Sequence, residues 1–355
     1  MGLRSFIAKR LVYSAILVIA VIGLNFLLFM MMPGDPTDFL MQGFSRESGE
    51  DREAHLARLK ELWGIGEPWH IQFFKYMRNL LSFNLGTELV GRKPISAVMT
   101  QKIPYTLFIL GGSTIFSIVI GIVLGIWAIQ RRGGVFDTSS VLFSLIVNSL
   151  PTFWIGLIFL WLFTNTLGWL PGARAFPMEW AAGNWPTVVT SSVVSGSSVM
   201  GFSIQLNPTE LWKLLYGFGA HAILPIATLT VFFFGGWLLL TRATMLDVIT
   251  EDYIVTARAK GLSEQAVLYK HAFRNASLPI ITSAALAFGF ILSGAIITET
   301  VFSYPGLGGW IWNSIQYRDY SVLMSVFYII SICVIIANII SDLLYGIIDP
   351  RIKYG

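Results

Sequence analysis

Charged side chains are scarce in this sequence: Asp, Glu, Lys and Arg make up 12% of its 355 residues, while 55% are apolar. A soluble domain carries roughly 25% charged residues, so this chain has about half the usual means of keeping a surface in water. Its one cysteine, Cys333, excludes an intrachain disulfide. The net charge of +4 is small, and we expect no nucleic-acid partner. The composition excludes an ordinary soluble protein and favours a membrane protein.

Motifs for catalysis and nucleotide binding are also missing. The sequence has no Gly-x-x-x-x-Gly-Lys-Ser/Thr loop, which cradles nucleotide phosphates in many ATPases. It lacks a pair of catalytic carboxylates and a His/Cys cluster at metal spacing, and its four histidines are scattered. We therefore predict no catalytic residue, no metal site and no cofactor bound by this chain.

Apolar runs of membrane-spanning length recur along the chain. A bilayer core of about 30 Å requires about 20 apolar helical residues. The runs are continuous rather than alternating, which predicts helices and excludes a barrel. The first run is too long for the core of a cleaved signal, so we expect it to be retained as a span. We predict an all-α polytopic protein with six transmembrane helices at residues 11–32, 106–129, 139–163, 222–240, 280–298 and 322–345.

The basic residues predict the orientation. Among the short connections, Lys and Arg concentrate in the N-terminal segment, residues 131–137, residues 242–279 and the tail, which places both termini in the cytoplasm. We expect three parts: residues 1–32, an extracytoplasmic cap at 33–105, and a five-span core at 106–355. The core carries an outer insertion at 165–220 and a cytoplasmic loop at 243–279. The serine-rich stretch 187–204 is a poor span, and a crossing there would invert everything that follows.

The cap segment shows helical spacing at residues 53–62 and an aromatic-rich amphipathic pattern at 68–81. It is interpreted either as a docking surface for an external partner or as a cover over the outer ends of the spans, and both interpretations remain open.

The cytoplasmic loop predicts two short helices that meet at a glycine. Thr250 is placed to cap a helix over residues 251–260, and Gly261 to end it in the left-handed conformation. Ser263 caps the second helix, and Pro279 closes the segment before the fifth span. Tyr253 and Ile254 are expected to be exposed on the first helix. Such a helix suits either a groove on a partner or the lipid headgroups, and the residues alone favour neither.

The same loop resembles the conserved cytoplasmic loop of permeases in binding-protein-dependent ABC importers, and it is most similar to the dipeptide/oligopeptide B-type branch. Further similarities occur in the same order along nearly the whole chain. The matching stretches are KRL at 9–11, PGDP at 33–36, LGWLP at 167–171, DYIVTARAKGLS at 252–263, TETVFSYPGLG at 298–308, RDY at 318–320 and DPR at 349–351. The glutamate that opens this loop in the wider family is replaced by Val255, so no salt bridge of that residue carries over. The connection at residues 172–220 is enlarged.

The resemblance implies the type I ABC importer transmembrane fold and a transport subunit that is not itself an enzyme. It implies a multi-pass protein of the cytoplasmic membrane that forms half a pathway for di- or oligopeptides beside a paralogous permease. Two ATPase subunits would bind ATP and Mg²⁺, and an extracytoplasmic solute-binding protein would deliver the cargo. The implied ATPase-coupling residues are Tyr253, Ile254, Ala257, Arg258, Lys260, Gly261, Leu262, Ser263 and Glu264. Oligosaccharide or nickel import in the same family and, more remotely, an ion-coupled carrier are the alternatives.

Polar and kink-forming residues within the spans are candidates for the translocation pathway. They are Asn148, Pro151, Ser283, Ser293 and Glu299. Glu299 lies near the outer end of its span, where a capping or gate-structural role competes with substrate contact. Gly121 and Gly125 have the spacing of a close helix-packing site, although the 33 glycines of the chain make coincidence a rival explanation.

Overall fold

The computed structural model describes residues 3–31, 66–88, 91–181, 189–196, 199–206 and 208–348, with the single positions 57, 61 and 64. Within this part, four helices are long and apolar enough to cross a bilayer alone. They are α1 (Leu3–Met30), α5 (Ile95–Gln130), α9 (Pro208–Val248) and α15 (Tyr320–Ile348). They contain four of the six predicted spans, and the predicted helical class is confirmed. Helix α5 begins three turns before the expected start at residue 106, inside the segment assigned to the cap.

The third predicted span is not one straight helix. Helices α6 (Val135–Ser149) and α7 (Thr152–Phe159) meet at a bend of 100°, and α7 continues as the π-helix η1 (Leu160–Thr166). Pro151 causes the break: it has no N–H to donate, and it keeps Leu150 in the extended conformation, with φ −83° and ψ 138°. If this bent pair is one span, the described residues hold five.

The fifth predicted span is interrupted near its C-terminal end. Helix α12 (Phe273–Phe290) passes into a short 3₁₀ turn, η3 (Ile291–Ser293), and the chain resumes as α13 (Ile296–Val301). Gly294 separates them with φ +74°, a conformation that glycine adopts without strain. The expectation that Pro279 closes the preceding loop is wrong, because Pro279 lies inside α12.

The remaining elements are short. They are α4 (Trp69–Leu81), α8 (Met178–Ala181), α10 (Asp252–Ala259), α11 (Glu264–Ala266), the π-helix η2 (Val267–Ala272) and α14 (Leu307–Gln316). Helix α4 confirms the amphipathic pattern at 68–81, whereas the pattern at 53–62 lies almost wholly outside the described residues.

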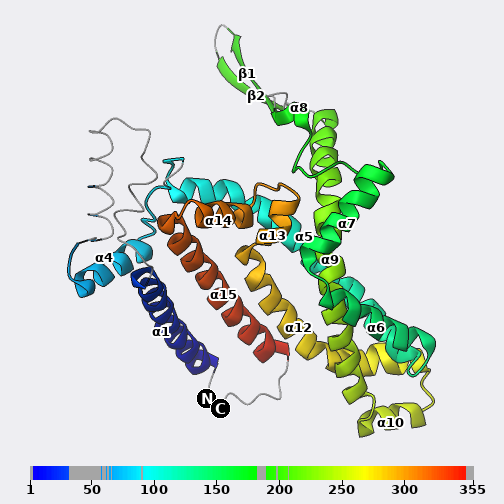
Figure 1. Ribbon diagram of the computed structural model, residues 1–355. Helices are drawn as coiled ribbons and strands as arrows, with labels where there is room; N and C mark the ends of the chain where they lie inside the picture. The colour runs from blue at the N-terminus through cyan, green and yellow to red at the C-terminus, as the bar shows by residue number, and fades with distance from the viewer. Residues whose placement is uncertain are drawn as a thin grey trace.

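The outer insertion contains an antiparallel hairpin, which the sequence did not predict. Strands β1 (Val189–Gly196) and β2 (Val199–Leu206) pair with Val189 opposite Leu206. Figure 1 shows the hairpin projecting beyond the start of α9. In lipid this hairpin would leave two strand edges without backbone partners, which argues against the crossing considered for residues 187–204.

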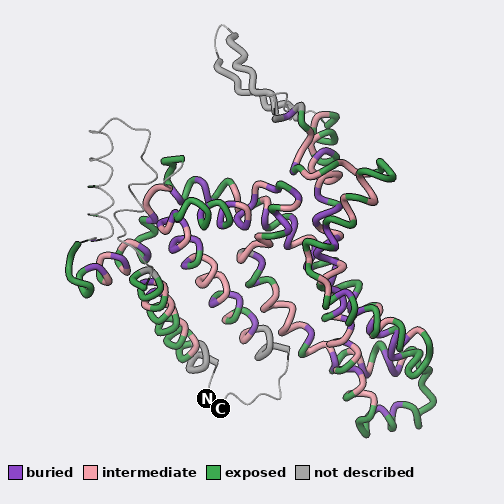
Figure 2. The backbone as a smooth tube through the Cα atoms, viewed as in Figure 1, coloured by how far each residue is buried: buried purple, intermediate pink, exposed green. Residues whose placement is uncertain are grey.

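Two glycines let α5 and α9 approach closely, which confirms the packing predicted for them. A Cβ atom on Gly121 would lie 2.8 Å from the carbonyl oxygen of Phe234, and one on Gly125 would lie 2.7 Å from Cβ of Thr241. Buried residues follow the facing sides of these helices (Figure 2). Small residues at such a contact bring two backbones together inside a membrane.

The two ends of the molecule carry different elements. Helix α1 begins and α15 ends on the same side as α10, while α13, α14 and the hairpin lie at the opposite side (Figure 1). We refer to these as the α10 end and the α14 end.

Candidate functional site

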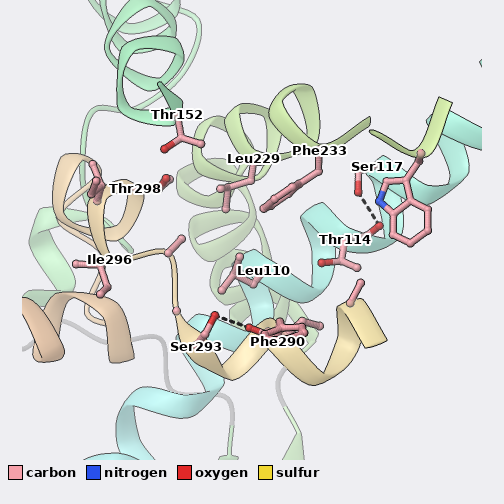
Figure 3. A pocket seen from close by; sticks show the side chains of 16 residues that line it. Leu110, Thr114, Ser117, Thr152, Leu229, Phe233, Phe290, Ser293, Ile296 and Thr298 are labelled. Atoms are coloured by element: carbon pink, nitrogen blue, oxygen red, sulfur yellow. Dashed lines mark hydrogen bonds between the residues drawn. The ribbon is translucent and has the colours of Figure 1, made fainter. Parts of the chain in front are cut away.

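A cleft of about 490 Å³ lies between α5, α9 and the segment from α12 to α13 (Figure 3). None of the described residues that line it is charged. Its hydroxyl groups belong to Thr114, Ser117, Thr152, Ser293 and Thr298. Its aromatic rings belong to Phe233, Trp237 and Phe290. The cleft therefore offers hydrogen-bonding oxygens and apolar surface, but no fixed charge.

One wall of this cleft is irregular backbone. The turn η3, Gly294 and Ala295 line it between two helical segments. Non-helical backbone at membrane depth occurs where it is buried in protein or faces a water-filled cavity. A Cβ atom on Gly294 would lie 3.0 Å from Cα of Gly308, so this wall rests directly on the start of α14. This irregular wall is therefore covered by protein rather than exposed to lipid.

The predicted pathway residues are dispersed around this cleft. Ser293 lines it, and its hydroxyl donates to the carbonyl oxygen of Phe290 at 2.6 Å. Asn148, Pro151 and Ser283 are not among the lining residues. Thr152, which follows Pro151, does line it.

Glu299 is fully buried and joins three elements at the α14 end. Its Oε1 accepts from Thr106 Oγ1 on α5 at 2.9 Å, and its Oε2 accepts from the backbone N–H of Gly309 at 3.1 Å. Thr106 Oγ1 in turn accepts from the N–H of Leu307 at 2.7 Å. The carboxylate thus caps the positive N-terminus of α14, and the structure favours the capping interpretation over substrate contact.

The turn between α13 and α14 has no room for larger residues. A Cβ atom on Gly306 would overlap the carboxylate of Glu299, and one on Gly308 would lie 2.8 Å from Cα of Ile296. Burial is the largest cause of the raised pKa of the Tyr304 hydroxyl in this turn.

We call residues 296–316, which comprise α13, this turn and α14, the outer elbow.

Sequence reasoning missed Thr106 because its partner Glu299 lies 193 positions away, and no local pattern links them. Thr114 and Ser117 could have been found, since two hydroxyls three residues apart share one face of an otherwise apolar helix.

The loop between α9 and α12 forms a second elbow, residues 252–266, which we call the inner elbow. Gly261 ends α10 with φ +76°, and Ser263 Oγ accepts from the N–H of Ala266 at 3.3 Å, which confirms both local predictions. The prediction for Thr250 is wrong, because Glu251 occupies the N-cap position without a side-chain bond. The hydroxyl of Thr250 donates instead to the carbonyl oxygen of Asp247 at 2.8 Å.

One face of α10 is anchored to the membrane helices. Ile254 and Ala257 are buried together with Met245 and Val267, so the expectation that Ile254 is exposed is wrong. Their spacing of three residues places them on one side of the helix, in a buried cluster that also contains Ile129 at the end of α5 and residues of η2. These two residues seat α10 and are not available on its outer surface.

The opposite face of α10 is accessible. The exposed members of the predicted coupling set are Tyr253, Arg258, Lys260, Gly261, Leu262, Ser263 and Glu264. Arg258 Nε donates to Glu264 Oε1 at 2.8 Å across the turn, and the hydroxyl of Tyr253 accepts from Asn275 Nδ2 at 2.7 Å. The result is a short, pre-shaped projection with a basic edge.

Comparison with known proteins identifies the kind of transporter to which these sites belong. Residues 117–354 match the family described as binding-protein-dependent transport system inner membrane component, and residues 3–109 match the N-terminal region of such proteins. The chain belongs to this family. Several spans make it a multi-pass membrane protein, and the family assigns it to transport rather than to catalysis.

Relatives of this inner membrane component match over nearly their whole length. The chain is 34% identical to the dipeptide transport system permease protein DppB of Alkalihalophilus pseudofirmus, over 98% of both chains. It is 31% identical to the oligopeptide transport system permease protein AppB of Bacillus subtilis, over 99% of this chain and 100% of the relative. It is also 31% identical to the glutathione transport system permease protein GsiC of Salmonella paratyphi A, over 99% of each.

Proposed function

We propose that this chain forms half of the membrane pathway of an ATP-driven importer of short peptides, beside a paralogous permease subunit. The peptide cargo is inferred from the near full-length match to permeases named for dipeptides, oligopeptides and glutathione. The uncharged cleft is compatible with this cargo, because hydroxyl groups bond to peptide amides and aromatic rings tolerate varied side chains.

The inner elbow is our candidate for the contact with the ATPase subunits, which would bind the ATP and Mg²⁺. Its outer face is exposed, while Ile254 and Ala257 belong to a buried cluster with Ile129 on α5 and Met245 on α9. A partner that moved the exposed face would therefore move helices that line the cleft. This arrangement supports a direct mechanical route from ATP-driven closure to the pathway.

The α10 end is then the cytoplasmic end, with both termini, and the α14 end receives cargo from an extracytoplasmic solute-binding protein. The arginines at 131, 132 and 258 and the lysine at 260 support this orientation, since short cytoplasmic connections are enriched in such residues.

A bulky residue at position 261 tests the coupling. A Cβ atom on Gly261 meets nothing within 4 Å, so a side chain there would point into the space reserved for the partner. We expect Gly261→Leu in the reconstituted importer to retain ATP hydrolysis and lose peptide-dependent uptake. Both rates would be measured in the same proteoliposomes.

Gly133 provides a matched control. It also has a positive φ, +75°, and open space around its Cβ position, but it lies in the turn between α5 and α6. Gly133→Leu carries the same backbone strain of about 1–3 kcal/mol without touching the inner elbow. Wild-type uptake in Gly261→Leu, or equal loss of uptake in both variants, would overturn the coupling proposal.

A further inference from the structure

A second pocket lies at the α14 end, separate from the cleft. It has a volume of about 330 Å³, within the range of small-molecule sites. It is formed by the first turns of α5, by helix α14, by the turn before α5 and by the turn after α14. The polar and aromatic residues that line it are Glu88, Lys93, Gln101, Lys102, Trp310, Asn313, Ser314, Tyr317 and Asp319. Unlike the cleft, this pocket contains both signs of charge.

Glu88, which lines the pocket together with a second carboxylate, Asp319, is held in place. Trp310 Nε1 donates to Glu88 Oε2 at 3.0 Å, which ties the loop before α5 to α14. Gly91 lies directly against the same carboxylate, and a Cβ atom there would overlap it. The backbone N–H of Glu88 donates to the carbonyl oxygen of Lys93 at 3.0 Å, which fixes the backbone of the acceptor. Glu88 is therefore positioned before any ligand arrives.

Lys102, one of the two lysines that line this pocket, has no such partner among the described residues. Lys102 is half-buried on α5, and no described residue forms an ion pair or hydrogen bond with its ammonium group. Glu88, the buried Glu299 and Lys93 act on it only through longer-range electrostatics. A partly buried charge without a direct partner is unfavourable, and an anionic group of a ligand would relieve that cost through a charge-assisted hydrogen bond.

We propose that this pocket receives a short zwitterionic peptide before it enters the cleft, with its α-carboxylate at Lys102 and its α-ammonium group at Glu88. Gln101 and Asn313 supply amide groups for the peptide unit, and Trp310 and Tyr317 supply aromatic surface for a side chain. The inference rests on the proposed peptide cargo and adds a second site to it.

The pocket is linked to the cleft through the outer elbow. Lys102 lies one helical turn before Thr106, which binds Glu299 and the start of α14. Residues 296–298, at the beginning of the same elbow, line the cleft. A peptide held at Lys102 therefore lies on the outer side of the element that forms the cleft wall.

The test is peptide uptake by the complete importer in proteoliposomes, with trialanine and its C-terminal amide as the two probes. Lys102→Met should raise the half-saturating concentration of trialanine about tenfold and leave that of the amide within about twofold. Lys102→Arg should restore most of the affinity for trialanine. Lys213→Met is the matched control, because Lys213 is exposed at the start of α9 and pairs with Glu210 at 2.8 Å; it should behave as wild type.

Each other result counts against the inference. No effect of Lys102→Met, or an equal effect on both probes, would overturn it. Weaker binding of the ligand-free solute-binding protein to the Lys102→Met importer, by the same factor, would make Lys102 a docking contact instead. A wild-type importer that takes up neither probe would refute the proposed peptide cargo itself. Unchanged basal ATP hydrolysis shows that the variant complex is intact.

Discussion

The outer and inner elbows are both short helical corners, but they are stabilised in opposite ways. The outer elbow is closed by a fully buried carboxylate, Glu299, which bonds to α5 and to the backbone of α14. The inner elbow carries its ion pair, Arg258 with Glu264, in solvent, and only its base at Ile254 and Ala257 is buried. The outer elbow is held by buried hydrogen bonds, whereas the inner elbow is held through one buried side of α10 and its opposite surface is exposed.

Because of this difference, we expect the outer elbow to contribute to stability and the inner elbow to contribute to coupling with a partner. A buried charge with several hydrogen bonds loses much when one partner is removed, whereas an exposed ion pair contributes little. The outer elbow therefore suits a rigid support for the cleft wall. The inner elbow suits a surface that a partner can bind, because we expect changes to its exposed residues to leave the fold intact.

Replacing Glu299 should give the largest effect. Both of its oxygens accept hydrogen bonds, so Glu299→Gln substitutes a donor for one acceptor and leaves a buried N–H unsatisfied. We expect the free energy of unfolding to fall by roughly 3 kcal/mol. Thermal unfolding of the full chain in detergent, followed by tryptophan fluorescence, measures the loss. Glu210→Gln, at an exposed ion pair on α9, is the control, and equal loss in both variants would contradict the comparison.

Truncating the base of the inner elbow should give an intermediate effect. Ile254 is fully buried, and Ile254→Ala removes a large side chain from a packed cluster, at a cost of about 2 kcal/mol. The loss is local, so α10 should detach before the long helices separate. Faster tryptic cleavage at Arg258 and Lys260 would report it. Val255→Ala, on the exposed face of the same helix, should leave cleavage unchanged; matching rates in the two variants would show that α10 is not anchored through Ile254.

Much of the membrane fold follows from the sequence because it is governed by local composition. Continuous apolar runs predict α1, α5, α9 and α15, since a chain in lipid must satisfy its own backbone. The glycine pair at 121 and 125 likewise predicts a close helix contact. The angle of the bend at Pro151 could not be predicted from the sequence, because proline is tolerated within membrane helices and its position alone does not determine the angle.

The role of Glu299 and the burial of Ile254 depend on distant parts of the chain. Glu299 is paired with a residue on α5, and Ile254 is covered by the ends of α5 and α9. Nothing near either residue in the sequence distinguishes a structural cap from a substrate contact, or a buried face from an exposed one. The spacing of Ile254 and Ala257 was the one available indication, because it marks an apolar face.

Breaking the exposed ion pair of the inner elbow should give the smallest effect. The side chains of Arg258 and Glu264 are 42% and 63% exposed, so water already solvates both groups. Glu264→Gln should change the free energy of unfolding by less than about 0.5 kcal/mol, and the difference should shrink further at high salt. The same thermal assay, run at low and high ionic strength, measures both quantities. A loss of unfolding free energy comparable to that of Glu299→Gln would show that the Arg258–Glu264 pair stabilises the inner elbow. The two elbows would then not differ in the way described above.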